Sequence, residues 1–154
     1  MKRAPLELAL RRRVRTWAPS RRELTAWASA ALGPRARGGE LGIAVVGARE
    51  SARLNSRYRG RRRATNVLSF PAPGAARGIR PRLLGDLVIC AGVLRTEAHQ
   101  QAKSLRAHWA HLVVHGALHL IGYDHERDAD ARRMERREVS VLRRLGFANP
   151  YVAS

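Results

Sequence analysis

Apolar residues along the chain fall into stretches that predict β-strands. Residues 6–10 alternate between apolar and polar positions and predict an edge strand, which the basic residues 11–15 would continue as a charged edge. The continuous apolar run 41–46 is typical of a buried strand. Residues 66–70 alternate again, and residues 83–90 form a further strand candidate.

Helical periodicity and capping residues mark the segments between these strands. Ser20 followed by Glu23 has the pattern of a capping box, and Gly33 with Pro34 ends the helix that it starts. The predicted helices run from Ser20 to Ala31, through Leu54 and Tyr58, over 97–101, from Ser104 into a histidine-rich segment, and from about Asp128 to Gly146.

The order of these elements indicates the fold class. Strands and helices interleave without the strict βαβ alternation of a parallel sheet, so we expect an α+β fold with a mixed central β-sheet packed with helices. Residues 73–81 show no periodicity and predict a mobile excursion. No internal repeat or linker divides the 154 residues, which fit a single domain over 1–154.

The charge balance points to a polyanionic partner. The chain has 30 basic and 12 acidic residues, a net charge of +18, and nucleic acid is the leading candidate for such a partner. Only Lys2 and Lys103 are lysine. Coding bias in a GC-rich genome explains arginine in place of lysine, but it does not explain why acidic residues are so few.

Cysteine content and hydropathy limit the cellular compartments in which we expect the protein. With Cys90 as its only cysteine, the chain cannot form an intramolecular disulfide or a cysteine-based zinc site. No apolar run approaches the roughly 20 residues of a membrane span, and Glu7 interrupts any signal-peptide core. We therefore expect a cytoplasmic protein without a membrane partner.

Three histidines with metal-ligand spacing carry the strongest chemical signal. His115 and His119 are four residues apart, which places them on one face of a helix about 6 Å apart along its axis. Gly122 can adopt the left-handed conformation that ends a helix, which would bring His125 back toward them. Three nitrogen ligands leave open the position that hydrolytic Zn²⁺ sites keep for water.

The other histidines are assigned to different roles. His111, His115 and His119 also form a stripe, but its outer members would lie about 12 Å apart along a straight helix, whereas nitrogens bound to one ion lie within about 4 Å of each other. We therefore place His111 in the core or behind the ligands. We expect His99 and His108 to be partly exposed helix residues.

The frame His-x-x-x-His-x-x-Gly-x-x-His is shared with the metzincin metalloproteases, and it predicts a metzincin-like three-histidine metal site on a helix and turn. Those proteases carry a glutamate general base directly after the first histidine, where this chain has Gly116. Asp124 is an alternative base, although adjacent residues at a turn point in different directions. Peptidase activity by the standard route is therefore disfavoured.

Four motifs carry a resemblance to a known family. They are Leu54-Asn55 with Tyr58-Arg59, Thr65-Asn66-Val67-Leu68-Ser69-Phe70-Pro71, Leu84-Gly85-Asp86, and His115-Gly-Ala-Leu-His119-Leu-Ile-Gly122-Tyr-Asp-His125. With these motifs in the right order, over about residues 40 to 151, the chain resembles the YbeY family of bacterial endoribonucleases and maturation factors of small-subunit ribosomal RNA. The first residues, up to about 39, match only in general pattern.

The resemblance implies a zinc-dependent, single-strand-specific endoribonuclease that matures the 3′ end of 16S ribosomal RNA and acts in ribosome quality control. It implies one Zn²⁺ ion held by His115, His119 and His125, and a metal helix packed beneath a mixed sheet. Arg59 is the implied catalytic arginine, and its planar fork suits a phosphate. The implied partners are ribosomal RNA and the small ribosomal subunit, with ribosomal proteins or an assembly GTPase as further candidates.

Alternatives stay open for the function and for several residues. A non-catalytic ribosome-assembly factor would use its zinc structurally and dock a basic face on ribosomal RNA, and a metalloprotease is the less favoured third function. Arg61, Arg62 and Arg63 extend a phosphate-binding surface or form a plain solvated loop. Asp86 either bonds within a turn or orients a ligand histidine. The tryptophans stack on bases or pack in the core.

Overall fold

A four-stranded sheet forms the centre of the computed structural model, which describes residues 4–74 and 82–152. The described strands are β1 (Glu7–Arg12), β2 (Glu40–Val46), β3 (Val67–Pro71) and β4 (Leu83–Cys90), in the order β1-β2-β4-β3. β1 is an edge strand, as predicted, but it ends at Arg12. Most of the excursion predicted over 73–81 lies outside the described residues.

The strand directions make this a mixed sheet. β1, β2 and β4 run parallel to one another, whereas β3 is antiparallel to its neighbour β4. Parallel neighbours need a crossover connection, and the first helix of the fold supplies it between β1 and β2. The predicted α+β class with a mixed central sheet is confirmed.

The helices are α1 (Arg21–Leu32), α2 (Ala48–Arg59), α3 (Ala91–Gln100), α4 (Leu105–Leu120) and α5 (Asp128–Arg144), with a 3₁₀ turn η1 (Gly33–Ala36) after α1. The capping box of Ser20 and Glu23 is present at the start of α1. The prediction of a helix over 97–101 covers only the end of α3. α3 begins at Ala91 because Ala91, Leu94 and Ala98 pack into the core at helical spacing.

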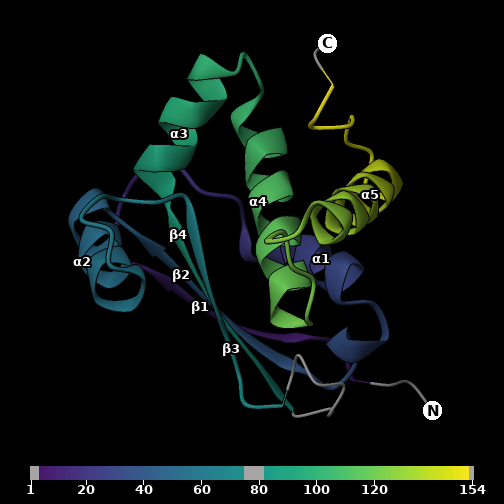
Figure 1. The fold of residues 1–154 in the computed structure, drawn as a ribbon. Coiled ribbons are helices and arrows are strands. Elements are labelled where there is room, and N and C mark those ends of the chain that lie inside the picture. The colour runs from purple at the N-terminus through teal and green to yellow at the C-terminus, as the bar shows by residue number, and fades with distance from the viewer. Residues whose placement is uncertain (1–3, 75–81, 153–154) are drawn as a thin grey trace.

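α4 packs against β3 and β4 and lies between the sheet and α5 (Figure 1). Successive side chains of a strand point to opposite faces, and Leu87 of β4 and Ser69 of β3 point toward α4. The Ser69 hydroxyl donates a hydrogen bond to the carbonyl of Gly116 at 3.3 Å. α2 lies on the other face of the sheet, where it packs on β4 and where the ring centroids of Tyr58 in α2 and Phe70 in β3 are 5.1 Å apart.

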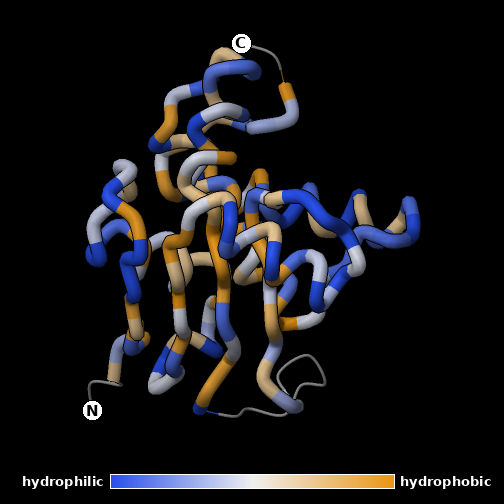
Figure 2. Tube along the Cα trace, turned by 90° about the vertical axis from the view of Figure 1, so that its left-hand side faces the viewer, coloured by the Kyte–Doolittle hydropathy of each residue, from blue (hydrophilic) through white to orange (hydrophobic). Residues whose placement is uncertain are grey.

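The hydrophobic core fills the space between the sheet and its helices. The strands carry hydrophobic stretches, and hydrophilic residues dominate the outer parts of the chain (Figure 2). Trp27 and Trp109 are core residues, whereas Trp17 is 49% exposed and available for stacking. Within 4–74 and 82–152, no helix has the length and apolar character needed to cross a membrane.

Gly85 marks a very close contact between the sheet and α4. Its φ is +145°, a conformation that side chains rarely adopt. A Cβ atom at this position would lie 2.5 Å from the Phe70 carbonyl oxygen and 2.8 Å from the Leu120 Cδ2 atom. The position therefore requires glycine both for its backbone conformation and for space.

We expect Gly85→Ala to lower the free energy of unfolding by about 2 to 4 kcal/mol, because backbone strain and overpacking add. Gly92→Ala is the matched control, since nothing lies within 4 Å of its Cβ position in α3, and it should retain or slightly raise stability. Urea denaturation measures both variants. Equal stability of the two would contradict the close contact.

Candidate metal centre

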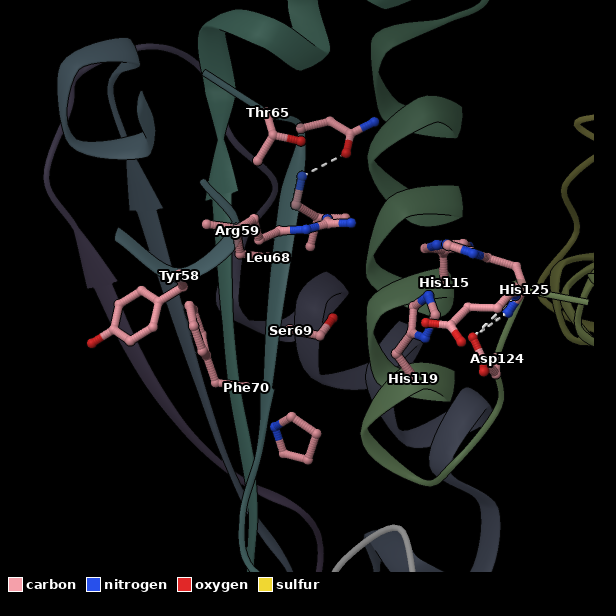
Figure 3. A pocket seen from close by; sticks show the side chains of 14 residues that line it. Tyr58, Arg59, Thr65, Leu68, Ser69, Phe70, His115, His119, Asp124 and His125 are labelled. Atoms are coloured by element: carbon pink, nitrogen blue, oxygen red, sulfur yellow. Dashed lines mark hydrogen bonds between the residues drawn. The ribbon is translucent and has the colours of Figure 1, made fainter. Parts of the chain in front are cut away.

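One helix and the turn after it supply the three predicted ligands. α4 carries His115 and His119 and ends at Leu120. Gly122 follows with φ of +102°, the positive value predicted for it, so the chain reverses at low steric cost. The reversal brings His125 back beside the two helical histidines (Figure 3).

The three imidazole rings form one compact group. Their centroids are 4.7 Å apart for His115 and His119, 4.8 Å for His119 and His125, and 5.6 Å for His115 and His125. One nitrogen of each ring lies within 4.8 Å of the others, close to the separation of about 4 Å that one bound ion allows. The first two rings are half-buried and the third is exposed.

A local turn fixes the position of His125. Asp124 Oδ1 accepts hydrogen bonds from the backbone N–H groups of His125 at 2.7 Å and Glu126 at 3.2 Å. One carboxylate oxygen of the alternative base Asp124 is thus used in shaping the turn. Glu126 also lines the pocket described below, and sequence reasoning did not single it out, although it directly follows a predicted ligand.

The surroundings of His119 favour its neutral imidazole. Burial, followed by coulombic repulsion from His115 and His125, lowers the pKa of His119 to about 4. A hydrogen bond to the Tyr123 backbone and the charge of Asp124 act in the opposite direction. His119 is therefore uncharged at neutral pH, and one of its ring nitrogens keeps a lone pair that a metal ion can bind.

A pocket of about 550 Å³ lies in front of the histidines. One wall carries the histidines and residues 124–126, and the other is formed by β3 with the end of α2 and the residues before β3. Figure 3 shows Arg59 on the β3 side, opposite His115. The three predicted ligands and the predicted catalytic arginine thus share one pocket.

Buried polar side chains of α2 hold the loop that follows Arg59. The Ser51 hydroxyl donates to the Thr65 carbonyl at 3.0 Å and accepts from the Thr65 N–H at 2.9 Å. The Asn55 amide donates to the Arg63 carbonyl at 2.9 Å. Ser51 and Asn55 are both 2% exposed, so these bonds are shielded from water. They fasten the loop to α2 and keep Arg59 at the rim of the pocket.

Sequence reasoning missed a buried carboxylate that touches two histidines. Glu138 of α5 is 0% exposed, and its Oε1 atom accepts hydrogen bonds from His115 Nδ1 at 2.9 Å and His111 Nε2 at 3.0 Å. The Tyr151 hydroxyl donates to Oε1 at 3.0 Å and to Oε2 at 2.7 Å. Burial by itself raises the pKa of Glu138, but the hydrogen bonds from both histidines hold it at about 2, so the group is charged at neutral pH.

His111, His115 and Glu138 make a second group whose ligand atoms lie within 4.8 Å of one another. Hydrogen bonds at 2.7 to 3.0 Å already account for their arrangement. The first group faces an open pocket and is the better candidate metal site. His111 lies behind the ligands, as predicted.

His108 is buried, so the prediction of a partly exposed residue is wrong. Its side chain is 4% exposed, and Nε2 lies 2.9 Å from a carboxylate oxygen of Glu97. The hydrogen bond from His108 is the main cause that lowers the pKa of Glu97. The Asn66 amide also donates to Glu97 at 3.3 Å, which ties α3 to the start of β3. His99 is exposed on α3.

Asp86 does not orient a ligand histidine. Its carboxylate lies over Gly42, where a Cβ would collide with Oδ1. The residues on either side of it in β4, Gly85 and Leu87, face α4 instead. Since side chains alternate along a strand, Asp86 points to the opposite face of the sheet.

The residue after the first ligand faces the sheet. A Cβ atom on Gly116 would lie 2.9 Å from Leu87 Cδ2 and 3.3 Å from Ser69 Oγ. This position therefore has no room for the glutamate that metzincin proteases use as a general base. A metalloprotease function is therefore disfavoured, because the packing at Gly116 excludes the side chain of the glutamate general base.

Comparisons with known proteins bear on the family and the fold. A family model described as Endoribonuclease YbeY matches residues 13–146. A relative named Endoribonuclease YbeY, from Stenotrophomonas maltophilia (strain R551-3), is 54% identical over 128 residues, which are 81% of this chain and 80% of the relative. The solution structure of TM1509 from Thermotoga maritima has a TM-score of 0.56 at 18% identity, covers 94% of this chain and 99% of its own, and supports the fold.

Gly116→Glu would recreate the protease sequence His-Glu-x-x-His, and we expect it to lower the free energy of unfolding by about 3 kcal/mol or more. The added side chain must enter space filled by Leu87 and carries a charge into the core. Gly116→Ala should lose less, because only the Cβ must fit and alanine favours a helix. Urea denaturation of the metal-free proteins measures both. A glutamate variant as stable as the parent would show that the position has room.

Proposed function

This chain belongs to the YbeY family of endoribonucleases, and on that basis we propose that it cleaves RNA with one Zn²⁺ ion held by His115, His119 and His125. The observation that carries the proposal is the three-histidine group facing Arg59 across an open pocket. The proposal includes a metzincin-like arrangement of the ion on the helix and turn, without the protease's glutamate.

The three histidines fit a zinc ion by their chemistry. Imidazole nitrogen is a preferred Zn²⁺ ligand, and the low pKa of His119 keeps a lone pair available at neutral pH. Three protein ligands on the wall of a pocket leave the approach from the pocket open to substrate. A zinc ion bound there would supply Lewis-acid polarisation of a phosphoryl oxygen and activation of water.

Arg59 supplies the charge on the opposite side of the pocket. Its guanidinium presents paired N–H donors that match two oxygens of a phosphate group. Cleavage of a phosphodiester adds negative charge to the phosphoryl oxygens, and a cation aimed at them stabilises that charge. Arg59 therefore binds the scissile phosphate and lowers the barrier to its cleavage.

The charge of the chain supports an RNA substrate. The net charge of +18 attracts polyanions, and Arg61, Arg62 and Arg63 are exposed on the loop next to Arg59. We propose a single-stranded substrate, because an unpaired strand can splay its nucleotides into a hollow of this size. Each loop arginine adds a modest contribution that salt weakens.

The physiological substrate that we propose is small-subunit ribosomal RNA. The resemblance of the motifs to the YbeY family supports maturation of the 3′ end of 16S ribosomal RNA and a role in ribosome quality control. The same proposal covers the small ribosomal subunit, ribosomal proteins or an assembly GTPase as partners, and a cytoplasmic location.

We expect the purified protein to hold about one zinc ion per chain and to cleave single-stranded RNA. A chelator should abolish cleavage, and added Zn²⁺ should restore it. His115→Ala and His119→Ala should lose both zinc and cleavage. Elemental analysis and a gel assay on small-subunit precursor RNA measure the two properties.

His99→Ala is the matched control for these histidine variants, because His99 is exposed on α3 and lies outside the pocket lining. It should retain zinc and activity. A zinc-loaded parent chain that leaves single-stranded RNA intact would refute the catalytic proposal, and so would a zinc-free His119→Ala variant that still cleaves.

We expect Arg59→Ala to reduce the rate of the cleavage step by roughly 100- to 1000-fold while zinc content stays unchanged. Arg53→Ala is the control, since Arg53 is an exposed arginine of the same helix outside the pocket lining. It removes the same charge and should leave the rate near that of the parent chain. Single-turnover kinetics with saturating protein measure this step.

A non-catalytic assembly factor makes the opposite prediction for Arg59→Ala. In that case the RNA affinity of the Arg59→Ala variant would fall, and the salt dependence of its RNA binding would become shallower. Any residual RNA cleavage would stay at the level of the parent chain. That outcome would replace the nuclease proposal by the structural-zinc alternative.

A further inference from the structure

Glu138 is a buried anion next to the candidate metal centre. It is 0% exposed, and the hydrogen-bond donors that reach its two oxygens are His111, His115 and Tyr151. No lysine or arginine forms an ion pair with it among the residues that the structure describes. A buried carboxylate without such a cation depends on the hydrogen bonds that it accepts.

The proton positions in this cluster follow from the carboxylate. An ionised carboxylate accepts hydrogen bonds and donates none, so the nitrogen of His115 that faces it must carry the proton. That nitrogen is Nδ1, at 2.9 Å from Oε1. In the neutral ring the lone pair then belongs to Nε2, the nitrogen left free for a metal ion.

We propose that Glu138 is the positioning residue of the metal centre, holding His115 in the tautomer and ring orientation that present Nε2 to the ion. The inference rests on the proposed function only in taking His115 as a ligand. A carboxylate that receives the second N–H of a ligating histidine fixes the ring and raises its basicity as a ligand. Glu138 comes from α5, 23 residues after the ligand in sequence.

Tyr151 and His111 hold the carboxylate in place. The Tyr151 hydroxyl lies 2.7 Å from Oε2 and 3.0 Å from Oε1, and its ring packs edge to face on His111 with centroids 5.3 Å apart. His111 Nε2 shares Oε1 with His115. The segment after α5 thus closes the cluster, so both oxygens are satisfied and Glu138 keeps one rotamer.

The chain contains a matched control for this role. Glu97 accepts a hydrogen bond from His108 at 2.9 Å, the same chemistry two helical turns earlier on α4. His108 is not a ligand and lies outside the lining of the metal pocket. Replacing Glu97 removes a partly buried charge beside a histidine and leaves the three proposed ligands and their contacts unchanged.

The experiment compares the zinc affinities of the parent chain, Glu138→Gln and Glu97→Gln by competition with a chromogenic chelator. Glutamine keeps the shape of the side chain but removes its charge. Glu138→Gln should weaken Zn²⁺ binding by roughly 10- to 100-fold, and Glu97→Gln should leave it unchanged. Thermal unfolding of the metal-free proteins checks that each variant is folded. Equal affinity of the parent chain and Glu138→Gln, or equal losses in both variants, would overturn the proposal.

A second measurement needs no variant. Long-range ¹H–¹⁵N NMR of the metal-free parent chain at about pH 8, where an ordinary histidine is neutral, reports the tautomer of each imidazole. His115 should carry its proton on Nδ1 and bind added Zn²⁺ through Nε2. A proton on Nε2, or zinc bound at Nδ1 together with His111, would refute the proposal. Failure of the parent chain to bind zinc would instead refute the proposed function.

Discussion

The candidate metal centre depends on how closely α4 packs against the sheet. At Gly116 the helix backbone approaches Leu87 so closely that a Cβ would lie 2.9 Å from its side chain, and this contact fixes which side of the helix faces the strands. Each residue turns an α-helix by about 100°, so His115 and His119 both lie on one flank of the helix, roughly 60° to 100° from the contact. That flank borders β3, and the pocket opens there. A rotation of α4 would move both ligands together away from Arg59.

One interaction that is local in sequence and one that is long-range complete the candidate metal centre once α4 is packed on the sheet. The third ligand is positioned locally, since the positive φ of Gly122 and the Asp124 side chain shape the turn that ends at His125. Orientation of the first ligand depends on Glu138, which reaches it only when α5 folds back along α4. The ligands can therefore be read from a short segment, whereas their orientation is a property of the folded chain.

This difference explains what the sequence could predict. Strand patterns, the capping box and the histidine spacing reflect neighbours close in sequence, and they predicted the mixed sheet and the cluster of three histidines. Glu138 lies in a helix rich in arginine, where a glutamate resembles a solvated residue, and nothing local indicates that it is buried. His108 was misjudged for the same reason, because its partner Glu97 belongs to another helix. The face of Asp86 depends on strand register, which pattern alone does not fix.

More than half of the 12 acidic residues form hydrogen bonds or ion pairs within the fold. Seven of them accept hydrogen bonds or ion pairs within the described residues: Glu7, Glu23, Glu40, Glu50, Glu97, Asp124 and Glu138. Two of the seven receive histidines, and one shapes the turn before His125. Four of these seven pair with Arg13, Arg82 or Arg106, and with 12 acids against 30 basic residues the chain keeps a net charge of +18, much of it on exposed arginines. Glu138, the one buried acidic residue within 4–74 and 82–152, is instead satisfied by histidine and tyrosine donors beside the candidate metal centre.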